Sequence, residues 1–335
     1  MARSIISGSF KAAVWSLAVI GVGGLVLVGM IAWPLRQPPE LASISDSRKS
    51  VDFSSLPAVE RFEARDGTSL GFRHYPPVGP AKGRVAVVIH GSSGSSATTI
   101  HALSAALATR GVESYAIDIR GHGASGTRGD IGYVGQLEDD LADFVAVVRK
   151  ASPKAPLTLI GHSAGGGFAL RVAASPIQDV FEQTVLLAPY LGYNAPSNRP
   201  NSGGWASPDI PRIIGLSVLR SLGIHCCEAL PVLEFAVPLN SKKILVSSYT
   251  DRLMRNFANH PDFRADIAAA SKPLTIIAGA NDELMLAEQY PEAVRGAARP
   301  VSVKLIEGVN HMGIVSDPAA VSIVVDYIAA AGPRS

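Results

Sequence analysis

The sequence predicts an α/β protein with a mostly parallel central sheet and helices on both faces of that sheet. Two observations carry this prediction. Short apolar runs with the length and composition of buried strands are bounded by turn residues, and stretches with helical spacing separate most of them. Such alternation is typical of parallel strands joined by helical crossovers. The 335 residues allow one large domain or two small ones, and we find no internal repeat.

The composition excludes several classes of protein. Hydrophobic residues make up 47% of the chain and glycine has no period, which excludes a disordered or collagen-like chain. The net charge is +2, from 30 basic and 28 acidic residues, and the basic residues form no cluster. A nucleic-acid-binding protein needs a basic face, so no nucleic-acid partner is expected. Two cysteines are too few for a disulfide scaffold.

The N-terminal region predicts a membrane anchor. After an N-terminal flank of residues 1–11, residues 12–35 contain no charged residue. As a helix, these 24 residues would be about 36 Å long, enough to cross a hydrocarbon core of about 30 Å. Trp15 and Trp33 lie near the two ends, where aromatic rings favour the membrane interface. The alternative is a cleaved signal peptide, whose apolar region would be shorter.

The basic residues that flank this segment barely distinguish its two orientations. Arg3 and Lys11 precede it, and Arg36, Arg48 and Lys49 follow it, so the positive-inside rule gives nearly a tie. An N-terminal anchor usually leaves its N-terminus in the cytoplasm. We therefore expect a membrane protein whose following domain lies outside the cytoplasm.

A linker and one domain are expected after the anchor. Residues 36–57 carry prolines, serines and mixed charge, which is typical of a linker that lifts a domain off a bilayer. The domain then spans residues 58–335, and Asp66-Gly67 marks a hairpin. The predicted strands are Arg61–Arg65, Leu70–His74, Arg84–His90, Glu113–Ile119, Pro156–His162, Gln183–Ala188, Pro273–Gly279 and Val301–Ile306. The predicted helices are Ala97–Arg110, a helix through residues 137–148, Ala164–Ala174 and Asp317–Ala331.

Residues 190–271, approximately, interrupt this alternation. They contain no clean strand and are too many for a plain loop, so we predict an inserted cap. Within it, Pro211–Ile224 has the spacing of an amphipathic helix. Cys226 and Cys227 follow this helix. Their adjacent Cα atoms, about 3.8 Å apart, are too close for an ordinary disulfide, so both are expected to be buried thiols.

The sharpest local signal is GHSAG at residues 161–165, a G-x-S-x-G pattern that occurs once. It follows a predicted strand and precedes a predicted helix, which is the context of a nucleophilic serine. The turn needs small neighbours because strand and helix pass closely. The alternative is a glycine-rich turn with an idle serine. We predict that Ser163 is a nucleophile.

A serine nucleophile needs a base, and the base needs an acid that orients it. Asp282 follows the strand Pro273–Gly279, and His311 follows the strand Val301–Ile306. Both therefore lie at the sheet edge that holds Ser163, in the chain order serine, acid, histidine. We predict these three residues as a catalytic triad, with Glu283 as the alternative acid. Taken separately, a turn-forming aspartate and a loop histidine would be the simpler interpretation.

Acyl transfer also needs two hydrogen-bond donors for the oxyanion. One candidate is the amide of Ala164. The other should come from the loop HGSSG at residues 90–94, where we choose the amide of Ser92, with Ser93 as the alternative. A flexible Gly/Ser turn is the simpler interpretation of that loop. This chemistry requires no metal and no cofactor.

These motifs, in this order, resemble the α/β-hydrolase superfamily. They are VVIHGSSG, DIRGHGASG, LIGHSAGG, IIAGANDE and GVNHMG. The second motif, residues 118–126, most resembles the branch of monoacylglycerol lipases, lysophospholipases and serine-aminopeptidase-like hydrolases. The resemblance covers the chain from about Arg61 to the C-terminus. It implies an α/β-hydrolase fold, the roles given above for the triad and oxyanion residues, and structural roles for Arg120 and His122.

The predicted function is a membrane-anchored serine hydrolase that cleaves carboxylic esters through an acyl-enzyme, as a lipase, lysophospholipase or esterase does. The same residues would serve a thioesterase, an acyltransferase, an amidase or a perhydrolase. A third possibility is a non-catalytic binding module derived from a hydrolase, although such modules usually lack a triad residue. The sequence indicates no oligomeric state.

The predicted cap helix favours a lipid-derived acyl ester as substrate. Pro211–Ile224 places aliphatic side chains on one face, which either packs on the catalytic domain or lines an acyl pocket. In the second case Ile214 and Leu219 would contact the substrate. Medium acyl chains would then bind more tightly than acetyl, because each buried methylene contributes about 0.8 kcal/mol.

Overall fold

The computed structural model of the chain describes residues 2–49, 51–241 and 244–330, and no side chain is described for residues 2–14, 48 and 239. The predicted end of the last helix at Ala331 and the end of the domain, residues 331–335, therefore lie outside the described residues. The same holds for the side chains of the predicted N-terminal flank.

A mostly parallel sheet of eight strands forms the centre of the domain, as the sequence predicts. Its strands are β1 (Glu60–Glu63), β2 (Ser69–Tyr75), β3 (Val85–Ile89), β4 (Glu113–Ile117), β5 (Leu157–His162), β6 (Gln183–Leu187), β10 (Leu274–Gly279) and β11 (Ser302–Ile306). Their spatial order is β1-β2-β4-β3-β5-β6-β10-β11. β2 pairs antiparallel with β1, which is the predicted hairpin, and with β4, while the remaining pairs are parallel. Every residue of β3, β5, β6 and β10 is buried, as expected for strands covered on both faces.

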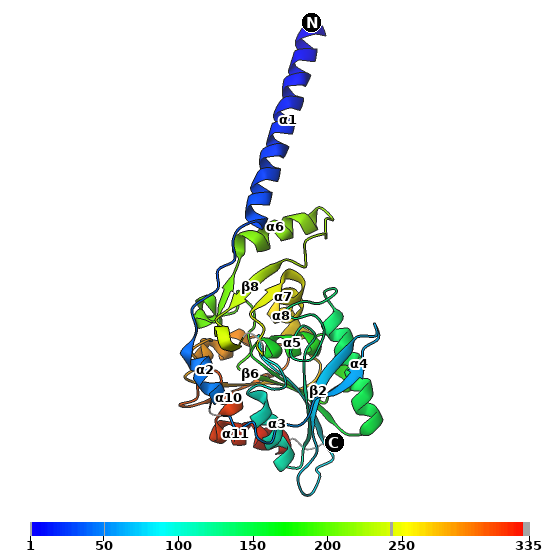
Figure 1. Cartoon of the computed structure of the whole chain (residues 1–335), viewed down its shortest axis with the longest axis vertical. Helices are drawn as coiled ribbons and strands as arrows, with labels where there is room; N and C mark the ends of the chain where they lie inside the picture. The colour runs from blue at the N-terminus through cyan, green and yellow to red at the C-terminus, as the bar shows by residue number, and fades with distance from the viewer. Residues whose placement is uncertain (1, 50, 242–243, 331–335) are drawn as a thin grey trace.

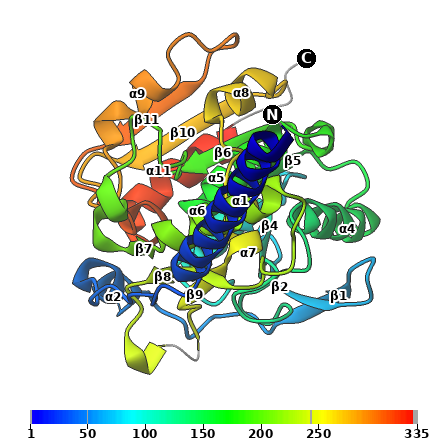
Figure 2. The same cartoon turned by 90° about the horizontal axis from the view of Figure 1, so that it is seen from above.

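Helices cover both faces of this sheet. The helices are α1 (Ala2–Ile31), α2 (Ala42–Lys49), α3 (Ile100–Thr109), α4 (Gln136–Ala151), α5 (Ala164–Ala173), α6 (Ile210–Ser221), α7 (Asp251–Asn256), α8 (Phe263–Ala269), α9 (Tyr290–Ala293), α10 (Gly313–Ser316) and α11 (Pro318–Ala330). Figure 1 shows α3 and α11 on one face of the sheet and α4 on the other, and Figure 2 shows α4 and α11 again from above. α4 buries Leu137, Leu141 and Phe144 on one side and carries acidic residues in its first turn, which suits the helix dipole.

The first helix differs from the predicted anchor. α1 ends at Ile31 rather than at residue 35, and it projects away from the domain beside α6 (Figure 1). In the part of the chain that the structure describes, no helix combines the length and the apolar content needed to cross a membrane. The predicted transmembrane span of residues 12–35 is therefore not supported.

The segment after α1 lies along the domain instead of forming the predicted spacer. Residues 42–49 form α2, and Leu41 and Ile44 pack against the hydrophobic core. The amide of Gln37 donates from Nε2 to the carbonyl oxygen of Val237 at 3.1 Å. These apolar and polar contacts with the domain hold the segment in place. Its sequence has no clear periodicity, so they were not predicted.

The cap lies between β6 and β10, where the sequence predicts it, but it contains strands that the sequence analysis missed. β7 (Ala206–Pro208), β8 (Pro231–Phe235) and β9 (Ser248–Thr250) form a separate antiparallel sheet in the order β7-β8-β9. These strands have only three to five residues and are partly exposed. Such short runs show no recognisable period.

The two cysteines are not buried as predicted. Cys226 is exposed and Cys227 is partly exposed, and both are free thiols. They lie in the loop after α6, where Leu222 and Ile224 are also exposed.

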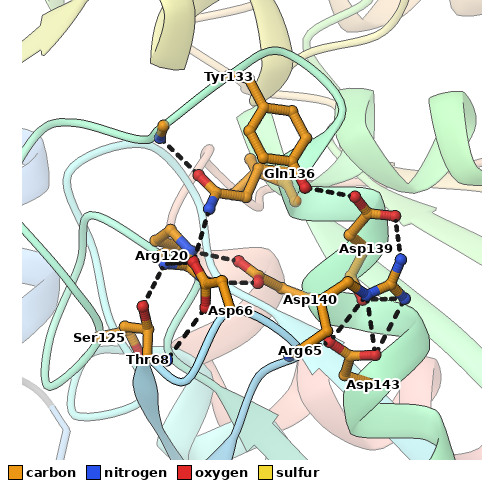
Figure 3. Close-up of polar contacts among 12 residues, drawn as sticks. Arg65, Asp66, Thr68, Arg120, Ser125, Tyr133, Gln136, Asp139, Asp140 and Asp143 are labelled. Carbon is orange, nitrogen blue, oxygen red and sulfur yellow. Dashed lines mark hydrogen bonds and ion pairs between the residues drawn. The ribbon is translucent and has the colours of Figure 1, made fainter.

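Arg120 joins the first hairpin to α4, as Figure 3 shows. Its buried guanidinium pairs with Asp140 at 2.7 Å and with Asp66 at 3.0 Å, and it donates to Thr68 Oγ1 at 2.9 Å. The hydrogen bond from Arg120 is the main cause that lowers the pKa of Asp66 to about 2. These contacts agree with the structural role that the resemblance implies for Arg120.

Candidate active site

Ser163 lies in the sharp turn between β5 and α5. Its backbone has φ 54° and ψ −120°, a region that non-glycine residues rarely occupy outside functional sites. The glycines around it are required by close contacts. A Cβ atom at Gly161 would lie 2.1 Å from the carbonyl oxygen of Gly165, and one at Gly165 would lie 2.3 Å from that of His90. The G-x-S-x-G spacing thus allows β5, α5 and the end of β3 to approach each other.

Asp282 and His311 lie side by side at the same edge of the sheet, in the loops after β10 and β11. The distance from His311 Nδ1 to Asp282 Oδ2 is 2.8 Å. The other carboxylate oxygen of Asp282 accepts the amides of Leu284 and Met285, both at 2.8 Å. The alternative acid, Glu283, accepts the backbone amide of His311 at 3.0 Å and does not contact the ring nitrogen. The geometry therefore favours Asp282 as the orienting acid.

The surroundings of Asp282 keep it ionised. Burial acts to raise the pKa of its carboxyl, but His311 and the two backbone amides outweigh burial and hold that pKa below its usual value. An ionised Asp282 fixes the proton of His311 on Nδ1, which leaves Nε2 free to act as a base. Ser163 and His311 line the same cavity, so this base faces the space that contains the serine.

His162, which precedes the serine, supports the loop that carries His311. Its Nε2 lies 3.1 Å from the carbonyl oxygen of His311. Burial is the main cause that lowers the pKa of His162 to about 3, so the ring is neutral and donates this hydrogen bond. The sequence analysis assigned no role to His162, because its partner is 149 residues away.

The two predicted oxyanion donors lie next to Ser163. Ser92 and Ala164 line a cavity together with the serine, and among the described residues neither backbone amide donates to a protein acceptor. The amide of Ser93, in contrast, donates to the hydroxyl of Tyr249 at 2.7 Å and is therefore occupied. The structure thus favours Ser92 over Ser93 as the second donor.

Tyr249 links the cap to the domain that contains the central sheet. Its hydroxyl, which accepts the amide of Ser93, also lies 2.6 Å from Nε2 of His122. Burial lowers the pKa of His122 well below its usual value and raises that of Tyr249, so the tyrosine donates to a neutral imidazole. This agrees with a structural role for His122. Tyr249 was not singled out from the sequence, since nothing local to β9 marks it.

Two cavities meet at Ser163. The larger has a volume of about 460 Å³ and the smaller about 270 Å³, and both are lined by Ser92, Ser163, Trp205 and Leu284. Trp205 lines both cavities, and its indole nitrogen donates to Ser92 Oγ at 2.9 Å. The smaller cavity extends below the cap sheet and is mainly apolar. Its apolar lining residues include Ala206, Leu233, Phe235, Met254, Phe257 and Met285.

The two predicted substrate contacts on the cap helix do not line either cavity. Ile214 is 48% exposed and lies in a surface groove with Met30 and Trp33 of the N-terminal region. Arg212 holds α6 in this orientation, because its guanidinium donates to the carbonyl oxygens of Ile31 and Trp33. Leu219 is only partly buried. The apolar face of α6 is therefore directed toward α1 and solvent, and not toward Ser163.

A metal site was not predicted, and within the described ranges no three His, Cys, Asp or Glu side chains are grouped in a way that could hold a metal ion.

Known proteins resemble this chain in sequence and in fold. Residues 79–318 match the hydrolase family described as "Serine aminopeptidase, S33". The monoglyceride lipase of Rattus norvegicus is 29% identical over 160 residues, which are 48% of this chain and 51% of that protein. The chain thus aligns with about half the length of this curated relative.

Solved structures share the fold. A soluble variant of monoglyceride lipase from Saccharomyces cerevisiae has a TM-score of 0.65 at 18% identity, covering 82% of this chain and 94% of that one. A putative aryl esterase from Burkholderia cenocepacia has a TM-score of 0.54 at 18% identity, covering 81% and 98%. The α/β-hydrolase fold predicted from the sequence is confirmed.

Proposed function

The chain belongs to the serine aminopeptidase (S33) family of hydrolases, and from this premise we propose that it is a serine hydrolase that cleaves carboxylic esters. The observation that carries the proposal is the hydrogen bond between Asp282 and His311 at the edge of a cavity that also contains the strained Ser163. Nothing in a purely structural turn would require this arrangement of nucleophile, base and acid.

In the proposed reaction, Ser163 Oγ attacks the ester carbonyl while His311 Nε2 takes its proton. The amides of Ser92 and Ala164 stabilise the negative charge on the carbonyl oxygen. His311 then returns the proton to the leaving alcohol, and an acyl-enzyme remains on Ser163. Water, activated by the same histidine, releases the acid and restores the free serine.

We propose lipid-derived acyl esters as the substrate class. Two relatives are named monoglyceride lipases, and the smaller cavity offers apolar side chains directly beside Ser163. Because each buried methylene contributes about 0.8 kcal/mol, kcat/KM should rise from acetyl to at least hexanoyl or octanoyl esters. A preference for acetyl or for charged acids would contradict the lipid assignment and leave the hydrolase assignment intact.

The test of catalysis is labelling with a fluorophosphonate probe, combined with hydrolysis of p-nitrophenyl esters of increasing acyl length. We expect the folded protein to label and hydrolyse, and Ser163→Ala to lose both activities while it keeps its melting temperature. A folded wild-type protein that is inert in both assays would contradict the proposal. Competing alcohol, amine or peroxide acceptors would show whether acyl transfer or perhydrolase chemistry accompanies ester cleavage, and amide and thioester substrates would test amidase and thioesterase activity.

Attachment to a membrane through α1 is a separate part of the proposal. It is supported by exposed apolar side chains on α1, which include Trp15, Leu17, Ile20 and Leu25. The apolar stripe of α6, with Ile210, Ile214, Val218 and Leu222 exposed at every fourth position, lies beside the end of α1. Exposed apolar area of this extent favours contact with lipid.

Cell fractionation tests this attachment. We expect the full chain to remain with membranes after salt and carbonate washes, and a variant lacking residues 1–31 to be released. A reporter at the C-terminus that works only outside the cytoplasm should be active if the domain lies there. Release of the full chain by salt alone would contradict attachment by apolar contact.

A further inference from the structure

The two cavities beside Ser163 differ in which catalytic group they contain. His311 lines only the larger cavity, and Ala164 lines only the smaller one. In ester cleavage the histidine that protonates the leaving alcohol must reach its oxygen, so the alcohol leaves on the side of His311. The larger cavity therefore receives the alcohol, and the apolar cavity under the cap sheet receives the acyl chain.

An unexpected part of the chain forms one wall of the larger cavity. Glu40, Ile44, Ser45, Lys49 and Phe53, here called the α2 wall, line it together with Ser163 and His311. Ile44 and Phe53 are half-buried, whereas Glu40 and Lys49 are exposed and lie on the solvent side. All five residues precede residues 79–318, the part of the chain that matches the family.

The α2 wall is held against the domain by its own contacts. Ile44 packs against the hydrophobic core, and the ring of Phe53 stacks on His101 of α3 with the ring centroids 5.8 Å apart. α2 also packs on α10, the short helix that begins two residues after His311. These contacts keep the wall next to the catalytic histidine.

We propose that the α2 wall selects the alcohol half of the substrate, with Ile44 and Phe53 as specificity-determining residues for esters of extended, apolar alcohols. This inference rests on the proposed ester-cleaving function. Ile44 and Phe53 supply apolar contact for the alcohol chain, while the exposed Glu40 and Lys49 stay hydrated at the solvent side. Selectivity for the acyl chain depends instead on the smaller cavity, which is lined in part by Leu233 of β8.

The experiment compares two series of esters with the full-length protein. In the alcohol series the acyl group is butanoyl and the alcohol is ethanol or hexanol. In the acyl series the alcohol is ethanol and the acyl group is butanoyl or octanoyl. We expect Ile44→Ala to lower the hexyl-to-ethyl ratio of kcat/KM about tenfold, and to leave the acyl ratio unchanged.

Two further variants serve as matched controls. Leu233→Ala should lower the octanoyl-to-butanoyl ratio and leave the alcohol ratio unchanged. Ile177→Ala removes a partly buried isoleucine that packs on the core and lines neither cavity, so it should change neither ratio. Phe53→Ala should reproduce the effect of Ile44→Ala and replaces it if Ile44→Ala does not fold.

The outcomes separate the two proposals. A folded wild-type protein that neither labels with fluorophosphonate nor hydrolyses any ester overturns the ester-cleaving function and, with it, this inference. If the wild type is active but Ile44→Ala and Phe53→Ala leave the alcohol ratio unchanged, or shift both ratios equally, only the role of the α2 wall is overturned.

Discussion

The proposed catalytic centre and the shell around it are held together by different kinds of contact. The turn around Ser163 is specified by residues within five positions of each other, and a Cβ atom at Gly161 or Gly165 would lie 2.1 or 2.3 Å from a backbone oxygen. The shell consists of the α2 wall and the cap, which are held by contacts between distant residues, such as Gln37 with Val237 and Ser93 with Tyr249. The comparison teaches that the turn of the nucleophile is local in sequence, whereas the walls of the cavities depend on how separate segments meet.

The largest expected effect is on the chemistry of the centre. Replacing Asp282 by Asn should lower kcat about 10⁴-fold, because the histidine loses the acceptor that orients it. Glu283→Gln keeps an oxygen that can accept the amide of His311, so we expect a loss below about tenfold. Steady-state kinetics on a short p-nitrophenyl ester checks both variants. If the two effects were reversed, Glu283 would be the orienting acid.

Two glycine-to-alanine substitutions, one beside Ser163 and one in α1, test whether close packing is confined to the proposed catalytic centre. Gly165→Ala places a Cβ atom 2.3 Å from the carbonyl oxygen of His90, so we expect a loss of unfolding free energy of about 3 kcal/mol or more. Gly29→Ala, in α1, meets no atom within 4 Å and should change stability by less than about 1 kcal/mol. Urea unfolding measures both. Equal stabilities would contradict the packing argument.

Substitution of two arginines compares the contribution of a buried ion pair to stability with that of an exposed one. Arg120→Gln leaves the buried carboxylate of Asp140 without its partner, and should cost about 3 kcal/mol of unfolding free energy. Arg110→Gln removes an exposed pair with Asp326 and should cost less than about 1 kcal/mol. Thermal or urea unfolding of the two variants checks this order, and a cost of Arg120→Gln no greater than that of Arg110→Gln would contradict it.

Two carboxyl groups should make stability depend on pH with opposite signs: Asp282 in the proposed catalytic centre and Asp266 in the cap. The folded pKa of Asp282 is below its ordinary value, so its stabilising contribution is present above that ordinary value and is lost as pH falls through the folded pKa. Burial raises the pKa of Asp266 in α8, although His260 opposes this, so Asp266 favours the folded state at low pH and that contribution is lost as pH rises.

The measurement is the difference in unfolding free energy between the wild type and each Asp→Asn variant, taken at pH 3 and pH 7. For Asp282→Asn the destabilisation should be larger at pH 7 than at pH 3. For Asp266→Asn it should be smaller at pH 7. The same trend in both variants would show that the environments of the two carboxyls do not differ as described.

The smallest effect on kcat/KM is expected from substitutions on the outer face of the cap. The sequence analysis proposed Ile214 and Leu219 as substrate contacts, and in that case a polar residue at either position would flatten the dependence of kcat/KM on acyl length. Because the structure places neither residue in a cavity beside Ser163, we now expect Ile214→Ser and Leu219→Ser to leave that dependence unchanged. Leu233→Ser should flatten it. Flattening by Ile214→Ser would indicate that α6 moves over the site during catalysis.

Much of the catalytic domain could be predicted from the sequence. The ends of the eight central strands lie within about two residues of the predicted ends, and strands buried on both faces were recognisable as continuous apolar runs such as VAVVI at β3. Ser163, Asp282 and His311 could be selected because each follows a strand that ends at one edge of a parallel sheet. The chain order serine, acid, histidine, with each residue after a strand, was therefore enough to propose the triad.

The location of the shell was decided only by the tertiary structure. The α2 segment has few apolar residues and no period, and the strands of the cap sheet are three to five residues long, so neither shows a pattern that sequence analysis can detect. Ile214 lies on an amphipathic helix, but periodicity shows only that a helix has an apolar face. It does not show what that face contacts. Here Arg212 directs it toward α1, through hydrogen bonds to backbone carbonyls about 180 residues away in the chain.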